Sequence, residues 1–361
     1  MKIFTCTCGQ SLYFGNTRCL KCNSAVGFDP ATFRMLPLQP GIAGTSGAMP
    51  DATLSATPGA TLGTTPGATP AALFDATGTL QACRNAIDYG VCNWLLPTGS
   101  GNYCMSCNLN HTIPNLLESD RRTWWRSLEQ AKRRLIYSLL VLGLPITGRD
   151  EEPNGLAFRF IEDKRTNPDV QEEHVNTGHL DGMITINIAE ADGVVRERTR
   201  QYTGESYRTL LGHFRHESGH YYYSRLINNS DRQQTFEDLF GNSTADYAEA
   251  LRYYYDNKFS MPLNPDLISH YAQSHPLEDW AEVWAHYLHM IDTLETAGNY
   301  GLAQGATHLD DIDDTLEKWG ELTLLLNSLN LSMGLESAYP FVLSDLSFRK
   351  LRFVHYLIYL G

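Results

Sequence analysis

Residues 206–226 read SYRTLLGHFRHESGHYYYSRL and contain the pattern HExxH at positions 216–220. On an α-helix, residues four positions apart project from the same face, about one turn apart. His216 and His220 can therefore bind one zinc ion together and leave other coordination positions open. Glu217 projects about 100° further round the helix, where its carboxylate reaches a metal-bound water without binding the metal. The stretch predicts a helix that carries two zinc ligands and a general base.

A surface helix that carries two histidines by chance is the alternative interpretation of this stretch. The same helix has an apolar face, which consists of Leu210, Leu211, Phe214 and Leu226. An apolar face of this kind suits an active-site helix packed into a core at least as well as a surface helix.

Length and charge limit the classes of function. The chain of 361 residues is long enough for a catalytic domain with a full core and one or two small modules. Its 28 basic and 41 acidic residues give a net charge of −13, which argues against broad binding of nucleic-acid phosphates. No apolar leader precedes the first cysteines, and the longest apolar run, 135–146, is too short to cross a bilayer. We therefore expect a soluble, cytoplasmic protein whose eight cysteines bind metal.

Two cysteine pairs near the N-terminus, a CxC and a CxxC ten residues later, have the spacing of a zinc ribbon. The pairs are Cys6 with Cys8 and Cys19 with Cys22. Such a small module buries little apolar surface, so metal binding supplies most of its folding free energy. The alternative is two disulfides in a secreted protein. We assign residues 1–35 to a zinc ribbon with one structural zinc ion.

Residues 36–80 differ abruptly in composition from the ribbon before them. They are rich in Pro, Gly, Ala and Thr, and TPGAT occurs at 57–61 and 65–69. The stretch has almost no charge and few large apolar groups, so it is predicted to be a flexible linker.

A second set of four cysteines follows within residues 81–114, namely Cys83, Cys92, Cys104 and Cys107. Two complete sets of four account for all eight cysteines, and the second set predicts a second structural zinc site. His111 is an alternative fourth ligand, but we treat it as a non-ligand. The spacing leaves open whether the two sites form separate ribbons or one domain with two zinc ions.

Residues 115–361 are expected to form one α+β domain, mostly helical, with a small mixed sheet on one side of the active-site helix. Helical periodicity predicts further helices at 120–142, 232–240, 244–256, 276–295, 311–329 and 344–359. Strands are predicted at 157–161 and 182–188. The second strand is expected at a sheet edge, where an extended peptide substrate can pair with it. An edge strand without that role is the alternative.

A catalytic zinc needs a third protein ligand. The metzincin continuation HExxHxxGxxH is excluded, because Tyr223 and Leu226 occupy its Gly and His positions. Gluzincins take the third ligand from a glutamate on a later helix, with an acidic residue one turn beyond it. The helix that opens at Pro276 offers Glu278 as ligand and Glu282 as hydrogen-bond acceptor for a ligating histidine. The pattern ExxxE also occurs on helix surfaces, but the tryptophans that flank Glu282 are not typical of a solvated face.

The pattern ExWAE at 278–282, with Tyr271 seven residues before Glu278, resembles the ExFAE pattern of gluzincin metalloproteases of the anthrax lethal-factor type. Over nearly the whole chain apart from the linker, the sequence is similar to a bacterial family of zinc-binding metallopeptidases with an N-terminal zinc ribbon. The segments that carry this similarity include the cysteine-rich N-terminus, GMITINIAEAD, LLGHFRHESGHYYY, PLEDWAEVWAHYLH and YPFVLSDLSFRKLRFVH. The resemblance implies a gluzincin-like zinc peptidase in which Glu217 is the catalytic base. Its implied metal ligands are His216, His220 and Glu278.

The expected reaction is hydrolysis of a peptide bond by a zinc-activated water, with Glu217 moving the proton from water to the leaving amine. A donor must stabilise the oxyanion, and Tyr271, taken from the lethal-factor resemblance, is the first candidate and His275 the second. The chain is expected to hold one catalytic and two structural zinc ions and to act on a protein or peptide substrate.

Two other classes of function stay open. One is a catalytically inactive zinc-binding protein that engages a protein partner through its ribbons, although the intact Glu217 argues against it. The other is a nucleic-acid binder that works through the ribbons. The first ribbon carries few basic residues, among them Lys2, Arg18 and Lys21, so this class is the least favoured. No membrane partner is expected.

Overall fold

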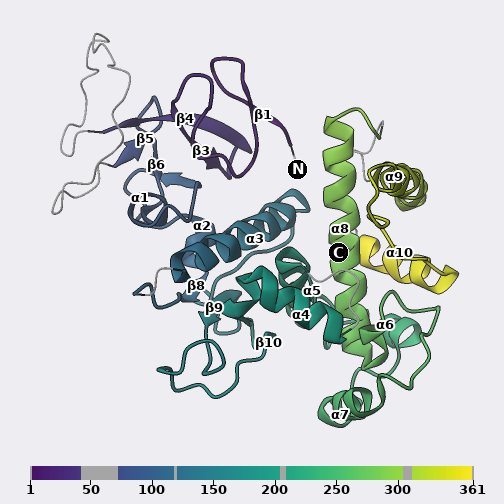
Figure 1. The fold of residues 1–361 in the computed structure, drawn as a ribbon. Coiled ribbons are helices and arrows are strands. Elements are labelled where there is room, and N and C mark those ends of the chain that lie inside the picture. The colour runs from purple at the N-terminus through teal and green to yellow at the C-terminus, as the bar shows by residue number, and fades with distance from the viewer. Residues whose placement is uncertain (1, 42–71, 118–119, 204–208, 304–310, 360–361) are drawn as a thin grey trace. The chain divides into compact units, whose positions relative to one another are not determined.

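The computed structural model describes residues 2–41, 72–117, 120–203, 209–303 and 311–359 (Figure 1). The chain divides into two compact units, Ile3–Asn108 and Leu109–Gly361, with Met1–Lys2 assigned to the second. Helices prevail over strands and the strands form small sheets, so the α+β class expected for the chain is confirmed. In the described part of the chain, no helix is both long enough and apolar enough to span a membrane.

The first unit is built from short strands and two short helices. Its strands form a two-stranded sheet, β1–β2, and a five-stranded antiparallel sheet in the order β3-β4-β5-β6-β7. The elements are β1 (Phe4–Thr5), β2 (Ser11–Leu12), β3 (Ala25–Asp29), β4 (Arg34–Pro40), β5 (Leu73–Phe74), β6 (Leu80–Ala82), α1 (Arg84–Asp88), β7 (Leu95–Pro97) and α2 (Met105–Asn108). The larger sheet joins the parts of the chain that carry the two cysteine sets. Both sets therefore belong to one unit.

Both ends of the linker expected at 36–80 belong to strands. β4 continues to Pro40 and β5 begins at Leu73, and the two strands pair through Gln39 with Phe74. This pairing orders residues whose composition alone indicated a linker. The middle of the expected linker, with both TPGAT repeats, falls in residues 42–71 and lies outside the described residues.

Phe28 and Trp94 form the centre of a small core in the first unit. Both are fully buried, and their ring centroids are 5.1 Å apart. The backbone N–H of Phe28 donates to Asn93 O (2.7 Å), and Asn93 Nδ2 donates to Phe14 O (2.6 Å). These contacts join the N-terminal segment to the segment that follows residue 71. Because the strands are short, we expect bound metal to contribute much of the stability of this unit.

The second unit contains a four-stranded mixed sheet in the order β10-β11-β9-β8. Its strands are β8 (Asn110–Thr112), β9 (Ala157–Ile161), β10 (Gly178–Leu180) and β11 (Met183–Asn187). β11 pairs in parallel with β9 and antiparallel with β10. The strand expected at the sheet edge is therefore inside the sheet, and that expectation was wrong. The two edges are β10 and β8, and neither strand was expected from the sequence.

A two-residue turn, Asp181-Gly182, explains the additional strand. Both residues have positive φ angles (47° and 81°), as in a type I′ hairpin turn, for which Asp-Gly is a preferred sequence. A Cβ atom at Gly182 would lie 2.3 Å from Asn154 O, so the position also requires glycine for lack of space. The turn folds residues 178–180 back onto β11 and places His179 on the edge strand.

The six further helices expected in the second unit are all present. The described part of this unit has one additional helix, α4, that was not expected from the sequence. The helices are α3 (Arg121–Val141), α4 (Gly193–Thr203), α5 (Leu210–Leu226), α6 (Gln233–Phe240), α7 (Tyr247–Asn257), α8 (Pro276–Asn299), α9 (Ile312–Ser332) and α10 (Asp345–Tyr359), with 3-10 turns η1 (Ile188–Ala191) and η2 (Tyr271–Gln273). The HExxH pattern lies in the middle of α5, as the sequence predicted.

Side-chain caps fix where α5 and α8 begin. Thr209 Oγ1 accepts a hydrogen bond from the N–H of Gly212 (2.9 Å) at the start of α5. At the start of α8, His275 Nδ1 accepts from the N–H of Leu277 (3.1 Å), and Pro276 occupies the first helical turn, where its missing N–H costs nothing. Each cap satisfies a backbone N–H that the first turn of its helix leaves without a partner.

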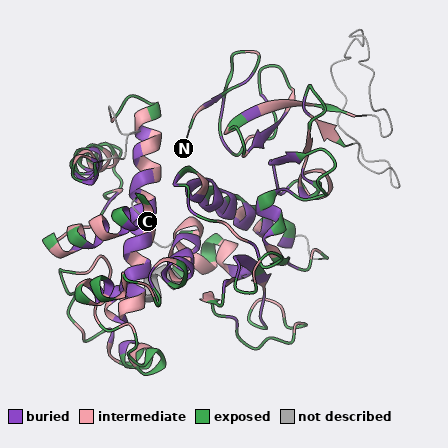
Figure 2. Ribbon diagram, turned by 180° about the vertical axis from the view of Figure 1, so that it is seen from behind, coloured by how far each residue is buried: buried purple, intermediate pink, exposed green. Residues whose placement is uncertain are grey.

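α5 and α8 pack against each other in the second unit (Figure 1), and α8 is buried over much of its length (Figure 2). Gly219 of α5 lies at a close approach, since a Cβ there would be 3.0 Å from Ala281 Cα and 3.2 Å from Trp284 Cβ. Trp280 Nε1 donates to Gly219 O (2.7 Å), and Trp284 Nε1 donates to Ser218 Oγ (3.1 Å). These contacts fix α8 against the middle of the HExxH pattern.

Candidate metal centres

Two helices bring together the three zinc ligands expected for a catalytic site. His216 and His220 lie on α5, and Glu278 lies in the first turn of α8. His216 Nε2 is 3.0 Å from Glu278 Oε2, and His220 Nε2 is 3.3 Å from Glu278 Oε1. One ligand atom from each residue lies within 4.8 Å of the other two.

The spacing of these atoms fits a zinc ion. Zinc binds imidazole nitrogen and carboxylate oxygen at about 2.0–2.1 Å, so ligand atoms in a tetrahedral site are about 3.3 Å apart. The two distances of 3.0 and 3.3 Å match that edge length. Catalytic zinc sites typically have three protein ligands and leave the fourth position to water or substrate, whereas structural sites have four protein ligands.

Glu282 holds His216 in the orientation that metal binding requires. Its Oε1 accepts a hydrogen bond from His216 Nδ1–H (2.7 Å), which leaves the lone pair of Nε2 for a metal. Burial lowers the pKa of His216, but the carboxylates of Glu278 and Glu282 raise it more, so the net shift is well above the usual value. The two carboxylates therefore make this position strongly attractive to a cation.

Glu217 lies beside the three ligands and lines the same cavity. The residue is 8% exposed, and its carboxylate has no hydrogen-bond partner among the described residues. Burial raises the pKa of Glu217, and the neighbouring His216 and His220 oppose that rise. Among the described residues, therefore, this buried carboxylate is not committed to a hydrogen bond.

Tyr271 and His275, the two candidates for an oxyanion donor, have different surroundings. Tyr271 lies in η2 and lines the cavity, with its ring centroid 6.0 Å from that of His216. Burial and the nearby carboxylates raise the pKa of Tyr271 well above its usual value, so its hydroxyl stays a donor. His275 instead uses Nδ1 to cap α8, and its Nε2 lies 3.2 Å from Ala245 O. Both ring nitrogens of His275 are thus engaged in the fold, which leaves Tyr271 as the candidate.

Tyr247, at the start of α7, contacts the centre and was not expected from the sequence. Its hydroxyl donates to Glu278 Oε1 at 2.5 Å. Partial burial and the Glu278 carboxylate raise the pKa of Tyr247, which keeps the phenol protonated. The contact orients the carboxylate that would bind the metal. No local pattern marks Tyr247, because it becomes a neighbour of Glu278 only when α7 folds against α8.

A cavity of about 1860 Å³ opens beside the centre. The three ligands, Glu217, Glu282 and Tyr271 all contribute to its lining. Pockets for small ligands usually measure about 300–1,000 Å³, so this cavity is large enough for a segment of polymer.

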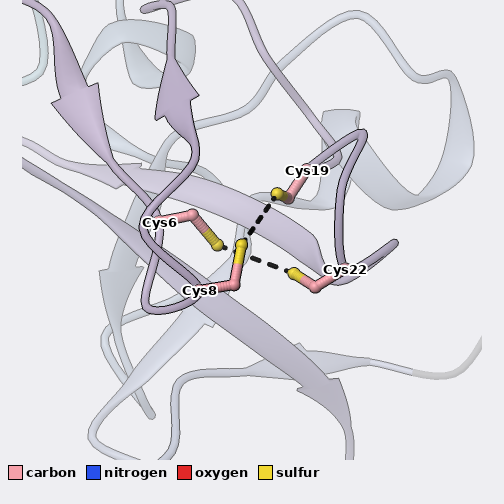
Figure 3. A group of neighbouring side chains, drawn as sticks. All are labelled: Cys6, Cys8, Cys19 and Cys22. Carbon is pink, nitrogen blue, oxygen red and sulfur yellow. Dashed lines mark hydrogen bonds between the residues drawn. The ribbon is translucent and has the colours of Figure 1, made fainter.

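The eight cysteines form two groups of four in the first unit, and Figure 3 shows that the sulfurs of the first group point toward one another. Cys6 Sγ is 3.7 Å from Cys22 Sγ, and Cys8 Sγ is 3.6 Å from Cys19 Sγ. In a tetrahedral site with zinc–sulfur distances of about 2.3 Å, sulfur atoms are about 3.8 Å apart, whereas a disulfide joins them at about 2.05 Å. The group therefore fits a closed zinc site.

The second group consists of Cys83, Cys92, Cys104 and Cys107, all of them buried. Cys92 Sγ is 3.7 Å from Cys104 Sγ, again the edge length of a zinc–thiolate site. The group is complete without His111, which belongs to β8 of the second unit and has its Nδ1 2.9 Å from Thr112 Oγ1.

Two packed helices that present HExxH and a glutamate to one cavity, together with a unit that holds two four-cysteine groups, define a zinc-binding protein with one open metal site. Residues 121–357 match the family described as "Putative zinc-binding metallo-peptidase", and residues 3–57 and 60–118 match a zinc-ribbon domain. The chain therefore belongs to this family of zinc-binding metallopeptidases with an N-terminal zinc ribbon, as the sequence resemblance predicted.

The chain is also similar to mycobacterial proteins over nearly its whole length. "Uncharacterized protein Rv2568c" of Mycobacterium tuberculosis (strain ATCC 25618 / H37Rv) is 38% identical over 366 residues, which cover 98% of this chain and 94% of the relative. "Uncharacterized protein Mb2598c" of Mycobacterium bovis shows the same identity and coverage. No solved structure matches the chain.

Proposed function

We propose that this protein is a zinc-dependent peptidase in which Glu217 is the general base. The observation that carries the proposal is the buried carboxylate of Glu217, which has no hydrogen-bond partner among the described residues and lies beside three converging zinc ligands in a large cavity. A structural zinc site would be closed by a fourth protein ligand and would need no unpaired carboxylate at its side. Membership of the metallopeptidase family also supports a peptidase function.

Each side chain at the centre has a role in this proposal. When bound, zinc supplies a Lewis acid that polarises the scissile carbonyl and lowers the pKa of water toward about 7. Glu217 accepts a proton from the attacking water and transfers it to the amine nitrogen as the C–N bond breaks. The Tyr271 hydroxyl donates to the carbonyl oxygen as negative charge develops there. Glu282 and Tyr247 hold two of the metal ligands in position.

We further propose that the two cysteine groups hold structural zinc, which brings the expected total to three ions, one for each ligand group. Four thiolates close each cysteine site, so these two ions have no catalytic position. The substrate is proposed to be a protein or peptide, because the cavity exceeds the size that a small ligand needs.

The test separates the base from the ligand. Glu217→Gln removes the proton acceptor but keeps the shape of the side chain, so hydrolysis of a mixed peptide library should collapse while zinc content stays unchanged. Glu278→Ala removes a ligand, so one zinc ion should be lost, as measured by inductively coupled plasma mass spectrometry. Glu321→Gln, on an exposed position of α9, is the matched control and should change neither property.

Two results would refute the proposal. One is that the zinc-loaded wild-type protein cleaves no peptide of the library. The other is that Glu217→Gln hydrolyses as fast as the wild type. Equal zinc loss in Glu217→Gln and Glu278→Ala would show that the roles of base and ligand are assigned wrongly.

A further inference from the structure

One wall of the cavity beside the metal centre is apolar and comes from a single helix. Tyr247, Leu251 and Tyr255 of α7 all line the cavity. They are spaced four residues apart, so they form one stripe along the helix. Tyr247 is 44% exposed and Tyr255 is 51% exposed, so both rings can be reached from solvent.

The stripe is held in a fixed position relative to the metal centre. At one end, the Tyr247 hydroxyl donates to Glu278 at 2.5 Å. Tyr254, seven residues after Tyr247 and so on nearly the same side of α7, is 3% exposed, and its hydroxyl is 3.0 Å from His270 Nδ1. The ring of Tyr254 also packs edge-on against Tyr271, with centroids 5.7 Å apart. The helix is therefore anchored by contacts with Glu278 and Tyr271, both at the metal centre.

The spacing of the stripe matches an extended peptide. Four residues of α-helix advance by about 6 Å, so the stripe presents apolar groups at steps of about 6 Å. In an extended strand, side chains on one side repeat every two residues, at about 6.4–6.8 Å. A peptide that lies along α7 thus places every second side chain against one member of the stripe.

A different part of the cavity lining is polar. The segment from Asp163 to His179 contributes Asp163, Arg165, Asn176 and His179, and it leads into the edge strand β10. Apolar side chains of residues 263–268 and 340–343 line further parts of the cavity.

We propose, resting on the peptidase function proposed above, that the substrates are extended peptides with apolar side chains at alternate positions, which pack on the stripe of Tyr247, Leu251 and Tyr255. Each apolar side chain that leaves water at this wall should raise kcat/KM about tenfold to a hundredfold, the range that a hydrophobic pocket provides for one such group.

The experiment compares two labelled peptides of identical composition. One has leucines at every second position, and the other has the same number at every third position, with serine and glutamine elsewhere. Binding is measured by fluorescence anisotropy with the zinc-loaded Glu217→Gln protein, and cleavage is measured with the wild type. We expect the first peptide to bind and to be cleaved at least tenfold better, and Leu251→Ser to abolish that preference. Leu324→Ser, at a 71% exposed position of α9 outside the cavity lining, is the matched control and should retain it.

The two arms separate this inference from the peptidase function. If the peptide with alternate leucines binds better but neither peptide is cleaved, the result would support peptide binding to the stripe on α7 and refute the proposed peptidase activity. Cleavage of both peptides at equal rates, or a preference that survives Leu251→Ser, would overturn the inference and leave the peptidase intact. Equal binding of both peptides would overturn it as well. If Leu251→Ser lowers the melting temperature, Tyr255→Ser at the exposed end of the stripe replaces it as the deciding variant.

Discussion

Gly219→Ala should destabilise this protein, although glycine to alanine within a helix ordinarily stabilises. In a helix interior the change gains about 1 kcal/mol, because alanine has less backbone freedom to lose. At Gly219 the added Cβ would lie 3.0 Å from Ala281 Cα, which is backbone and cannot rotate away. Favourable carbon–carbon contacts lie at about 3.5–4.0 Å, so α5 and α8 must separate. Overpacking of this kind costs about 1–3 kcal/mol, which gives a net loss of up to about 2 kcal/mol.

Gly320→Ala on α9 is the matched control. Gly320 also lies inside a helix, but a Cβ there would meet nothing within 4 Å. This variant should therefore show the full gain of about 1 kcal/mol. Because both variants share the change in helix propensity, the difference between them isolates the overpacking, about 1–3 kcal/mol.

The assay is urea unfolding of zinc-loaded protein, followed by far-ultraviolet circular dichroism, with zinc affinity measured in parallel by competition with a chelator. Gly219→Ala should also weaken zinc binding, because the separation of α5 and α8 moves His216 and His220 away from Glu278. Equal stabilisation by both variants, with unchanged zinc affinity, would refute the reasoning from the close approach of the two helices.

Three further predictions concern metal, tyrosines and pH. Native mass spectrometry should find three zinc ions per chain, of which the two in cysteine sites resist mild chelation; a single ion with freely reactive cysteines would contradict this. Tyr271→Phe should lower kcat about 10²–10³-fold with little change in zinc affinity, whereas Tyr247→Phe should weaken zinc binding first, since it loses the hydrogen bond to Glu278; the reverse pattern would exchange their roles. Burial lowers the pKa of His286 to about 4, from about 6.5 in an unfolded chain, so the unfolded state takes up the proton first. The contribution of His286 to stability is therefore complete above pH 6.5 and falls by about 3 kcal/mol as the pH decreases to 4, and His286→Gln should flatten this slope in urea unfolding at a series of pH values.

The parts of the site that the sequence predicted are those with local patterns. The spacing of His216 and His220 is a property of one helix, and Pro276 marks where the next one begins. Glu278 could be predicted as a ligand because it lies four residues, about one helical turn, before Glu282 in α8. In each case the relevant residues lie within one turn of each other, so the helical period alone places them on the same face.

The remaining features depend on contacts between distant segments. The contact of Tyr247 with Glu278 arises only when α7 packs beside α8, and no period in the sequence encodes it. The sheet that unites the two cysteine sets pairs strands on both sides of residues 42–71. β10 could have been found, because Asp181-Gly182 is a hairpin signal, but its three residues are too few for a visible alternation.

The hydrogen bonds from two tryptophans of α8 to α5 give this protein a built-in optical reporter. Trp280 and Trp284 are fully buried, and their indole N–H groups donate to Gly219 O and Ser218 Oγ inside the HExxH pattern. Indole emission responds to the polarity and hydrogen bonding of its surroundings, so a small shift of α5 against α8 changes the emission without any label. With the other four of the six tryptophans replaced by phenylalanine, stopped-flow fluorescence would time the settling of the two helices around an arriving metal ion.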